Sequence, residues 1–353
     1  ATYGEYNAAT DEGAYRPWSP SVSGSSDSLM PWESLGRWGR NFVSSATSVA
    51  ELQAFHGPDA ALPEPVRVYA GLGSAGSVAE RVELAVRELD RAGAFDREVL
   101  AVWVPTGTGW MIPEAAAAFE QLHRGNTAIV GVQYSFLPSL IAVFVDRGAE
   151  IETGAALFEA VYARWVDLPP ETRPKLVLFG KSLGTAGVET SFVGADAVAS
   201  IAMLTARTDG ALLVGAAHSN PIHSKITRER DPGSPAWQPV FDSGRTVRFL
   251  NRSGNQPDRA ATWSRPRIVY LQHPSDPVPL WGIETLWSPP EWMGEPRGFA
   301  VPDAMIWVPG VTAIQAIADL IFQLSTPPGF GHVYSPDYVE GWAAVDSPPG
   351  WTE

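Results

Sequence analysis

The sequence predicts an α/β protein with a mainly parallel, doubly wound sheet. Short unbroken apolar runs, such as Val99–Val104 and Leu176–Phe179, have the composition of strands that are buried on both faces. Amphipathic stretches of helical period separate these runs, as expected where each helix returns the chain to a parallel neighbouring strand. The only G-x-S-x-G of the chain, Gly180–Gly184, directly follows one of the runs.

Composition sets the outer limits on function. The 353 residues carry a formal net charge of −14, which argues against nucleic acid or an anionic membrane surface as the main partner. The chain contains no cysteine, so thiol catalysis, disulfides and cysteine metal sites are excluded. No apolar run reaches the roughly 18 residues of a spanning helix. Because the chain begins at Ala1 and not at Met, we expect a processed form whose upstream part could include a membrane anchor.

The expected elements follow in chain order. Residues 1–65 are rich in Gly, Ser, Pro and Trp, with a short helical signal at Ser48–Phe55, and predict an arm packed on a larger catalytic domain of residues 66–345. The strands expected in that domain are Arg67–Ala70, Val99–Val104, Thr127–Gln133, Leu176–Phe179, Ala211–Val214, Arg267–Leu271 and Ala304–Val308. The main helices expected are Ser77–Ala92, Pro113–His123, Gly154–Val166 and Ala313–Leu324.

The glycines after the first strand allow an alternative. Gly71, Gly73 and Gly76 form a literal G-x-G-x-x-G, the pattern of a dinucleotide-binding turn. Such a site also needs an acidic residue at the end of the next strand to bind a ribose, and that strand ends in Pro105-Thr106 instead. A plain tight turn is the favoured interpretation, and no cofactor is predicted.

The G-x-S-x-G segment predicts a nucleophilic serine. Its spacing is typical of a sharp strand-to-helix turn that exposes Ser182 Oγ at the carboxyl edge of the sheet, although an ordinary strand-to-helix turn has the same residues. The backbone N–H of Leu183 would supply one oxyanion donor, and the glycine-rich segment after Val104 would supply another. Thr106 and Gly107 are the candidates in that segment, which could also be a simple helix-entry loop.

The region from residue 215 to 262 lacks a clear period and is expected to form an irregular cap or lid. It contains His218 and His223, whose spacing would not place both on one helix face, so a metal site is not predicted.

Two further residues complete a candidate catalytic set. Asp276 lies in a proline-stiffened loop after a strand, and His332 lies in a glycine-rich loop after the last expected strand. The chain order Ser, Asp, His is that of the α/β-hydrolase fold, with His332 as the base and Asp276 as the residue that orients it. The five competing histidines are His56, His123, His218, His223 and His273, and the competing acids are Asp258 and Asp303.

Several longer stretches resemble one particular family. They include Arg67-Val-Tyr-Ala-Gly-Leu, Thr106-Gly-Thr-Gly-Trp, Gln133-Tyr-Ser-Phe-Leu-Pro-Ser, Phe179-Gly-Lys-Ser-Leu-Gly, Tyr270-Leu-Gln-His-Pro-Ser-Asp-Pro-Val and Gly331-His-Val-Tyr. The chain is similar over residues 15–345 to an actinobacterial α/β-hydrolase family whose catalytic domain often follows an N-terminal helical membrane region. The resemblance implies a serine hydrolase fold with Ser182, Asp276 and His332 as its triad. It implies little about the substrate.

Two positions depart from that family's pattern. Lys181 stands before the serine where relatives are expected to carry Glu; it could tune the site or simply point aside. Gly215–Pro221 replaces a more aromatic segment, which puts the relatives' substrate preference in doubt for this chain.

The leading hypothesis is a hydrolase that cleaves an ester or thioester of an apolar acyl group on a small or lipid-like substrate. An acyltransferase would use the same triad, and a non-catalytic binding protein could share the scaffold. Aromatic residues expected near the carboxyl edge of the sheet could line an apolar cleft, or merely cover helices and loops. They are Trp110, Tyr134, Phe136 and Trp281.

Overall fold

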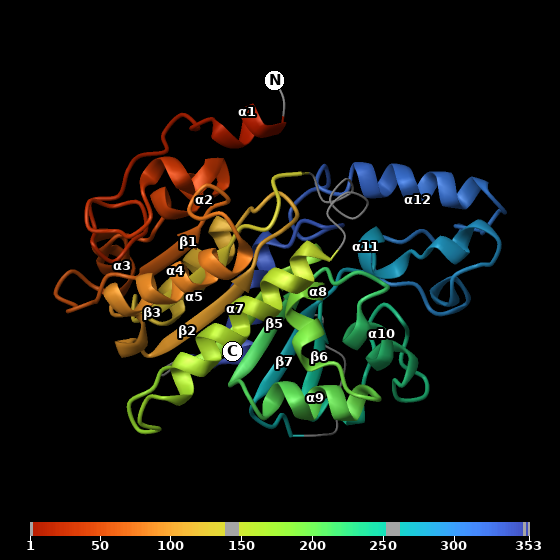
Figure 1. Ribbon diagram of the computed structural model, residues 1–353. Coiled ribbons are helices and arrows are strands. Elements are labelled where there is room, and N and C mark those ends of the chain that lie inside the picture. The colour runs from red at the N-terminus through yellow and green to blue at the C-terminus, as the bar shows by residue number, and fades with distance from the viewer. Residues whose placement is uncertain (1–2, 138–147, 252–261, 349–350, 352–353) are drawn as a thin grey trace. The chain divides into compact units, whose positions relative to one another are not determined.

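The computed structural model describes residues 3–137, 148–251, 262–348 and 351 (Figure 1). The chain divides into two compact units, which are described separately below. The first unit comprises residues 1–191 and 348–353, and the second comprises residues 192–347.

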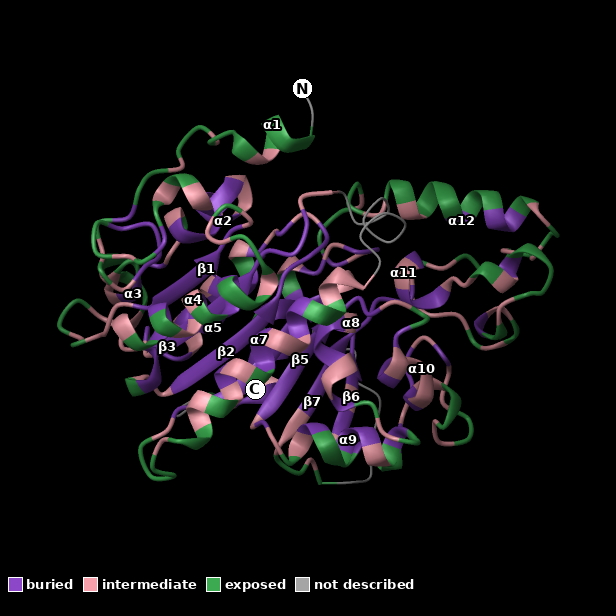
Figure 2. Ribbon diagram, viewed as in Figure 1, coloured by how far each residue is buried: buried purple, intermediate pink, exposed green. Residues whose placement is uncertain are grey.

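Four parallel strands form the core of the first unit. They are β1 (Val66–Ala70), β2 (Val99–Val104), β3 (Thr127–Val132) and β4 (Lys175–Lys181), in the spatial order β1-β3-β2-β4. Every residue of β1, β2 and β3 is buried, which explains why these strands appear in the sequence as continuous apolar runs and not as an alternation. Figure 2 shows the strands as the most deeply buried part of the ribbon.

The helices of this unit begin where the sequence supplies caps. They are α1 (Tyr3–Ala8), α2 (Gly36–Ser44), α3 (Val49–His56), α4 (Val78–Arg91), α5 (Pro113–Leu122), α7 (Ala149–Val166) and α8 (Leu183–Glu189). Ser48 and Ser77 each form a capping box with the glutamate three residues later, which fixes the starts of α3 and α4. Pro113 stands at the first position of α5, where its missing N–H costs nothing.

The first 65 residues are fastened to β1 through Arg67. The backbone of Ser23 donates to the Arg67 carbonyl at 2.9 Å, and Val22 forms a parallel bridge with Arg67. The fully buried Arg67 guanidinium makes a bidentate ion pair with Glu120, with distances of 2.6 and 2.9 Å, and also donates to the Phe42 carbonyl. A buried charge is tolerated only when it is paired and hydrogen-bonded in this way.

The described residues of the second unit form three parallel strands and five α-helices. Its strands are β5 (Gly210–Val214), β6 (Val247–Leu250) and β7 (Arg267–Leu271), in the order β5-β7-β6. Its helices are α9 (Ala197–Thr205), α10 (Pro221–Arg228), α11 (Pro277–Leu280), α12 (Val311–Ile321) and α13 (Tyr338–Val345). All strand pairings described within the two units are parallel, as the sequence predicted.

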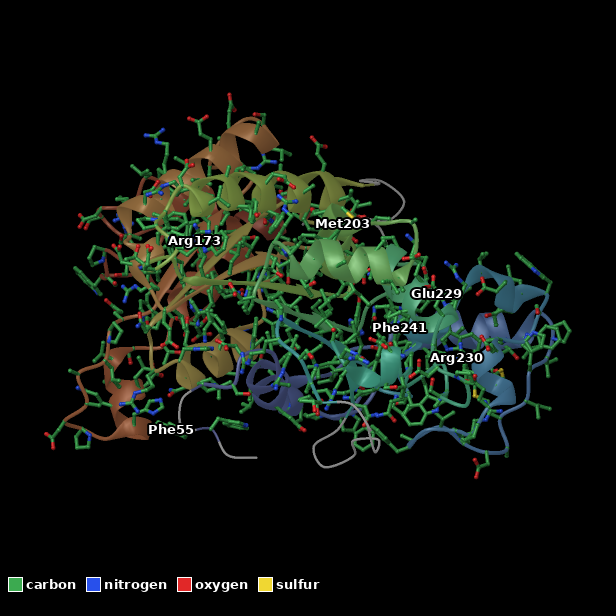
Figure 3. The ribbon with its side chains drawn as sticks, turned by 90° about the horizontal axis from the view of Figure 1, so that it is seen from below. Phe55, Arg173, Met203, Glu229, Arg230 and Phe241 are labelled. Atoms are coloured by element: carbon green, nitrogen blue, oxygen red, sulfur yellow. The ribbon has the colours of Figure 1, made fainter. Side chains whose placement is uncertain are left out.

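Two stretches of the second unit differ from expectation. Residues 215–262 include the helix α10 and the strand β6, where irregular chain was expected. Arg230, labelled in Figure 3, fastens the end of α10 to Glu291 and Glu295 through ion pairs of 2.5 and 2.7 Å. Whether this region acts as a lid stays a prediction.

The strand expected at residues 304–308 is wrong. No strand lies there, and Ile306 is 73 % exposed. The apolar side chains Ile306 and Val308 lie at the surface and do not fill a sheet. The last strand before His332 is therefore β7.

Candidate active site

Ser182 lies at a strained turn between β4 and α8. Its φ of 53° and ψ of −124° are conformations that non-glycine residues rarely adopt. The two glycines of the motif permit this turn, because a Cβ on Gly180 would approach the Gly184 carbonyl oxygen to 2.6 Å, and a Cβ on Gly184 would approach the Val104 carbonyl oxygen to 2.2 Å. The strand-to-helix turn predicted from the spacing is thus present in the first unit.

Asp276 and His332 form a buried pair in the second unit. His332 Nδ1 lies 2.7 Å from Asp276 Oδ2, and the backbone N–H of Val278 donates to Asp276 Oδ1 at 2.9 Å. Asp276 is fully buried and His332 is 2 % exposed. Burial alone would raise the pKa of Asp276. The charge and hydrogen bond of His332, together with hydrogen bonds from the Tyr334 hydroxyl and the Val278 N–H, outweigh burial, so the pKa lies below its ordinary value.

Gly215 at the end of β5 makes room for this pair. It has a φ of 56°, and a Cβ at this position would lie 2.4 Å from His332 Cε1 and 3.1 Å from Asp276 Oδ2. Any side chain here would displace the imidazole. Nothing in the sequence signalled this role, because residues 215–221 stood out only as a departure from the family pattern.

Tyr334 is a second residue that the sequence did not reveal. Its hydroxyl donates to Asp276 Oδ2 at 2.6 Å and accepts from the backbone N–H of His273 at 3.1 Å. Its ring stacks on the His273 imidazole, with centroids 4.1 Å apart. Burial and the neighbouring Asp276 carboxylate raise the pKa of Tyr334 well above its ordinary value, so the phenol stays a donor to Asp276.

His273, the nearest rival to His332, has both ring nitrogens engaged. Nδ1 contacts the Gly331 carbonyl at 2.8 Å and Nε2 contacts Asp337 Oδ2 at 2.9 Å. His273 therefore holds the loop that carries His332 and has no nitrogen left for a substrate. His332 Nε2, in contrast, is buried and has no hydrogen-bond partner among the described residues.

Three of the remaining histidines contact groups elsewhere in the fold. His56 contacts the Gln121 carbonyl, His218 pairs with Glu284, and His223 contacts Gln272. Burial lowers the pKa of His223 to about 4, which keeps its ring neutral. His123 lies 3.9 Å from Glu98. Asp258 lies outside the described residues, and Asp303 is exposed.

Comparison with known families decides the classification. The model of the alpha/beta-hydrolase family matches residues 66–353, and the model of that family's N-terminus matches residues 1–46. The chain belongs to the alpha/beta-hydrolase family. The predicted fold class is thereby confirmed for this hydrolase. The actinobacterial origin and the upstream membrane region implied by the resemblance stay predictions.

Comparison with individual proteins adds little. No curated protein matches the chain. Among solved structures, a Trichoderma reesei cutinase in complex with a C11Y4 phosphonate inhibitor matches with 13 % identity and a TM-score of 0.32, covering 76 % of this chain and 85 % of that chain. A TM-score of this size carries no argument about the fold or the substrate.

The segment after β2, in which the hydrolase was expected to hold an oxyanion donor, is tightly fixed. The Thr106 N–H donates to the Trp110 carbonyl at 3.2 Å, and the Gly109 N–H donates to the Thr106 carbonyl at 2.8 Å. The Tyr134 hydroxyl donates to the Pro105 carbonyl at 3.1 Å. Because the Thr106 amide is already engaged, Gly107 is the better candidate donor of the two.

Lys181 and the aromatic candidates of the first unit lie near this segment. Lys181 is 4 % exposed, and its ammonium group lies 5.3 Å from the centre of the Trp110 ring, within cation–π range. Trp110 in turn contacts Trp38, with ring centroids 6.0 Å apart. Tyr134 is buried and Phe136 is half-buried.

The second unit contains a small cavity beside Asp276. Its volume is about 130 Å³. Its lining residues are Pro274, Ser275, Asp276, Pro277, Leu280, Trp281, Trp292, Ala300, Val301, Pro302, Met305 and Asp319. Trp281 and Trp292 meet edge to face, with centroids 5.5 Å apart. Trp281 thus borders a largely apolar space, and its role in a substrate pocket stays a prediction.

Metal-binding clusters and membrane-spanning helices are two further features to consider in the described part of the chain. No group of three or more His, Asp or Glu side chains is placed there to hold a metal ion. No single described helix is long and apolar enough to cross a membrane; only α8 with its 3₁₀ extension (Leu183–Phe192) and α9, taken together as a bent pair, pass the test of length and composition.

The contact between Tyr334 and Asp276 leads to a first prediction. We expect Tyr334→Phe to lower kcat about tenfold with little change in KM, because a hydrogen bond to a charged group contributes roughly 1.5–3 kcal/mol and Asp276 would hold His332 less firmly. The measurement is steady-state kinetics on a soluble ester, with Tyr15→Phe, at an exposed position, as the matched control. An unchanged kcat in a folded Tyr334→Phe enzyme would show that Asp276 needs no such support.

Proposed function

We propose that this hydrolase cleaves an ester or thioester of an apolar acyl group through an acyl-enzyme on Ser182. The observation that carries the proposal is the buried Asp276–His332 pair, since chain order alone selected these two residues from several acids and histidines. The strained backbone at Ser182 supports the same proposal. The triad of Ser182, His332 and Asp276 is the arrangement that this chemistry requires.

Each residue has a defined role in the proposed reaction. His332 Nε2 accepts the proton of Ser182 Oγ as the oxygen attacks the acyl carbon, and then protonates the departing alcohol or thiol. Asp276, bonded to Nδ1, fixes the tautomer that leaves Nε2 able to accept a proton, and stabilises the imidazolium that forms. Water activated by the same nitrogen then releases the acid and restores Ser182.

The developing oxyanion requires backbone donors. The N–H of Leu183, the first residue of α8, is the proposed first donor, and the positive end of the helix dipole adds to it. Gly107 is the proposed second donor, since the Thr106 amide is bonded to Trp110.

The proposed acyl group is apolar because the cavity beside Asp276 is lined mainly by apolar side chains. Trp281 and Trp292 form part of one wall. Trp110, Tyr134 and Phe136 of the first unit remain candidates for further contacts. Lys181 lies against Trp110 and is proposed to orient this ring; it is not proposed to act in the chemistry.

A series of p-nitrophenyl esters of increasing chain length tests the acyl preference. We expect kcat/KM to rise by up to about fourfold for each added methylene until the cavity is filled, because burying one methylene contributes about 0.8 kcal/mol. Trp281→Ala should move the preference to longer chains, whereas Trp18→Ala, at a position that is 94 % exposed, should leave it unchanged. A profile that is flat or highest for acetate would contradict the apolar pocket.

A further inference from the structure

Helix α12 and the segments around it expose an unusual number of large apolar side chains. We call this region the α12 surface. It consists of Ile283, Leu286, Trp287, Ile306, Val308, Val311, Ile314, Ile317, Ile321, Phe322 and Leu324. Their exposed fractions range from 39 % to 73 %. Figure 2 shows most of α12 in the exposed class.

These residues belong to one connected structure within the second unit. Helix α12 contacts the 3₁₀ turn Ile283–Leu286 directly. The Trp307 indole donates to the Thr285 carbonyl at 2.9 Å, and the Val308 N–H donates to Thr312 Oγ1 at 2.7 Å. The exposed side chains thus lie on segments that hold one another in place.

Helix α12 exposes the large apolar side chains that an ordinary surface helix buries. A helix on a protein in water normally turns its large apolar residues toward the core. Helix α12 buries only Thr312, Ala313 and Ala316, and it exposes Ile314, at 69 %, and Ile317 and Ile321, at more than half. An apolar surface of this kind indicates that another apolar medium covers it.

Charge identifies the medium. Residues 304–324 contain one ionisable side chain, Asp319, and the turn 283–287 adds only Glu284, while no Lys or Arg follows Arg297 in the sequence. The surface therefore offers no attraction to phosphate or to an anionic lipid. It contains one Trp, Trp287, and none of the Arg and Tyr side chains that are also enriched where protein interfaces bind most strongly. A surface of mainly aliphatic side chains with two aromatic rings and no basic residue matches a lipid surface of zero net charge.

Length determines how the helix would meet such a surface. Its 11 residues span about 16 Å, roughly half of the hydrocarbon thickness of a bilayer, so α12 would lie along the interface and not cross it. Asp319, on the same helix, lines the cavity that Asp276 also lines. A lipid surface in contact with α12 would therefore lie next to that cavity.

We propose that the α12 surface docks this hydrolase onto uncharged or zwitterionic lipid surfaces. Docking rests on the exposed side chains of the second unit and not on Ser182, so it stands or falls independently of the proposed catalysis.

The experiment is co-flotation of the purified chain with phosphatidylcholine vesicles. We expect the wild type and Ser182→Ala to float equally, and the triple variant Ile314→Ser, Ile317→Ser, Ile321→Ser to bind at least about tenfold more weakly, since three exposed apolar side chains are lost. The matched control changes three exposed apolar residues near and on α9, Val193→Ser, Val198→Ser and Met203→Ser, and should float as the wild type does (Figure 3 labels Met203). Circular dichroism and Tm verify that both variants fold.

Three outcomes would overturn the proposal. The first is no flotation of the wild type, or flotation only when phosphatidylserine is added. The second is equal flotation of the α12 triple variant, or loss in the α9 control instead. The third is a wild-type chain that forms dimers and does not bind vesicles, while the α12 triple variant is monomeric. That result would show that a second copy of the chain, and not lipid, covers the α12 surface.

Discussion

Ser182→Ala is expected to abolish labelling by a fluorophosphonate and to lower kcat by at least about 10⁴-fold. The probe requires an activated serine oxygen, and a hydrolase without its nucleophile keeps only the rate that binding and the oxyanion donors supply. The substitution should leave Tm nearly unchanged, because the strained backbone is held by the packing of Gly180 and Gly184 and not by the hydroxyl.

The labelling is read by mass spectrometry of the intact chain and then of its peptides. Ser26→Ala, at an exposed position of the N-terminal region, serves as the control and should label as the wild type does. If Ser182→Ala still became labelled at the wild-type rate, another residue would have to be the nucleophile.

Asp276→Asn is expected to lower kcat/KM by about 10³–10⁴-fold while the fold is kept. The carboxylate accepts from His332, Tyr334 and Val278, and an amide presents a donor where one of these bonds needs an acceptor, so His332 would adopt the wrong tautomer. Because the pKa of Asp276 lies below its ordinary value, the wild-type carboxylate is ionised from about pH 5 upward, and the loss should be similar across that range.

The control is Asp303→Asn, which changes an exposed carboxyl that does not contact His332. Kinetics between about pH 5 and 8 distinguish a lost orienting charge from a shifted titration. Near-wild-type turnover of Asp276→Asn would place the acid elsewhere, and a loss confined to one end of the pH range would point to titration of a different group.

Much of the fold could be predicted because buried parallel strands are unbroken apolar runs. The limits of β2 at Val99 and Val104 follow from such a run, which ends at Pro105. The same reasoning failed at residues 304–308, where an apolar run lies at the surface. Composition does not distinguish an apolar segment that fills a sheet from one that lies at the surface.

The candidate site could be predicted only where chain order or a fixed spacing carries information. Ser182, Asp276 and His332 became candidates in this way, and their catalytic roles stay predictions. Tyr334 and Gly215 were not predicted, because their roles depend on the three-dimensional fold. The fold places the Tyr334 hydroxyl against Asp276, and it places Gly215 where any side chain would collide with His332. The engagement of the Thr106 amide likewise depends on the local path of a loop.

The hydrogen bonds around Asp276 also determine where protons can travel. The Tyr334 hydroxyl donates its only hydrogen to the Asp276 carboxylate, and its oxygen accepts a hydrogen bond from the main-chain N–H of His273. A backbone amide does not act as an acid or base near neutral pH, so this chain of hydrogen bonds cannot carry a proton beyond Tyr334. The other carboxylate oxygen, Asp276 Oδ1, accepts a hydrogen bond from the backbone N–H of Val278. Among the hydrogen-bonding side-chain atoms of Asp276 and His332, only His332 Nε2 has no partner in the described part of the chain, so both halves of the proposed reaction use that one atom to pass a proton.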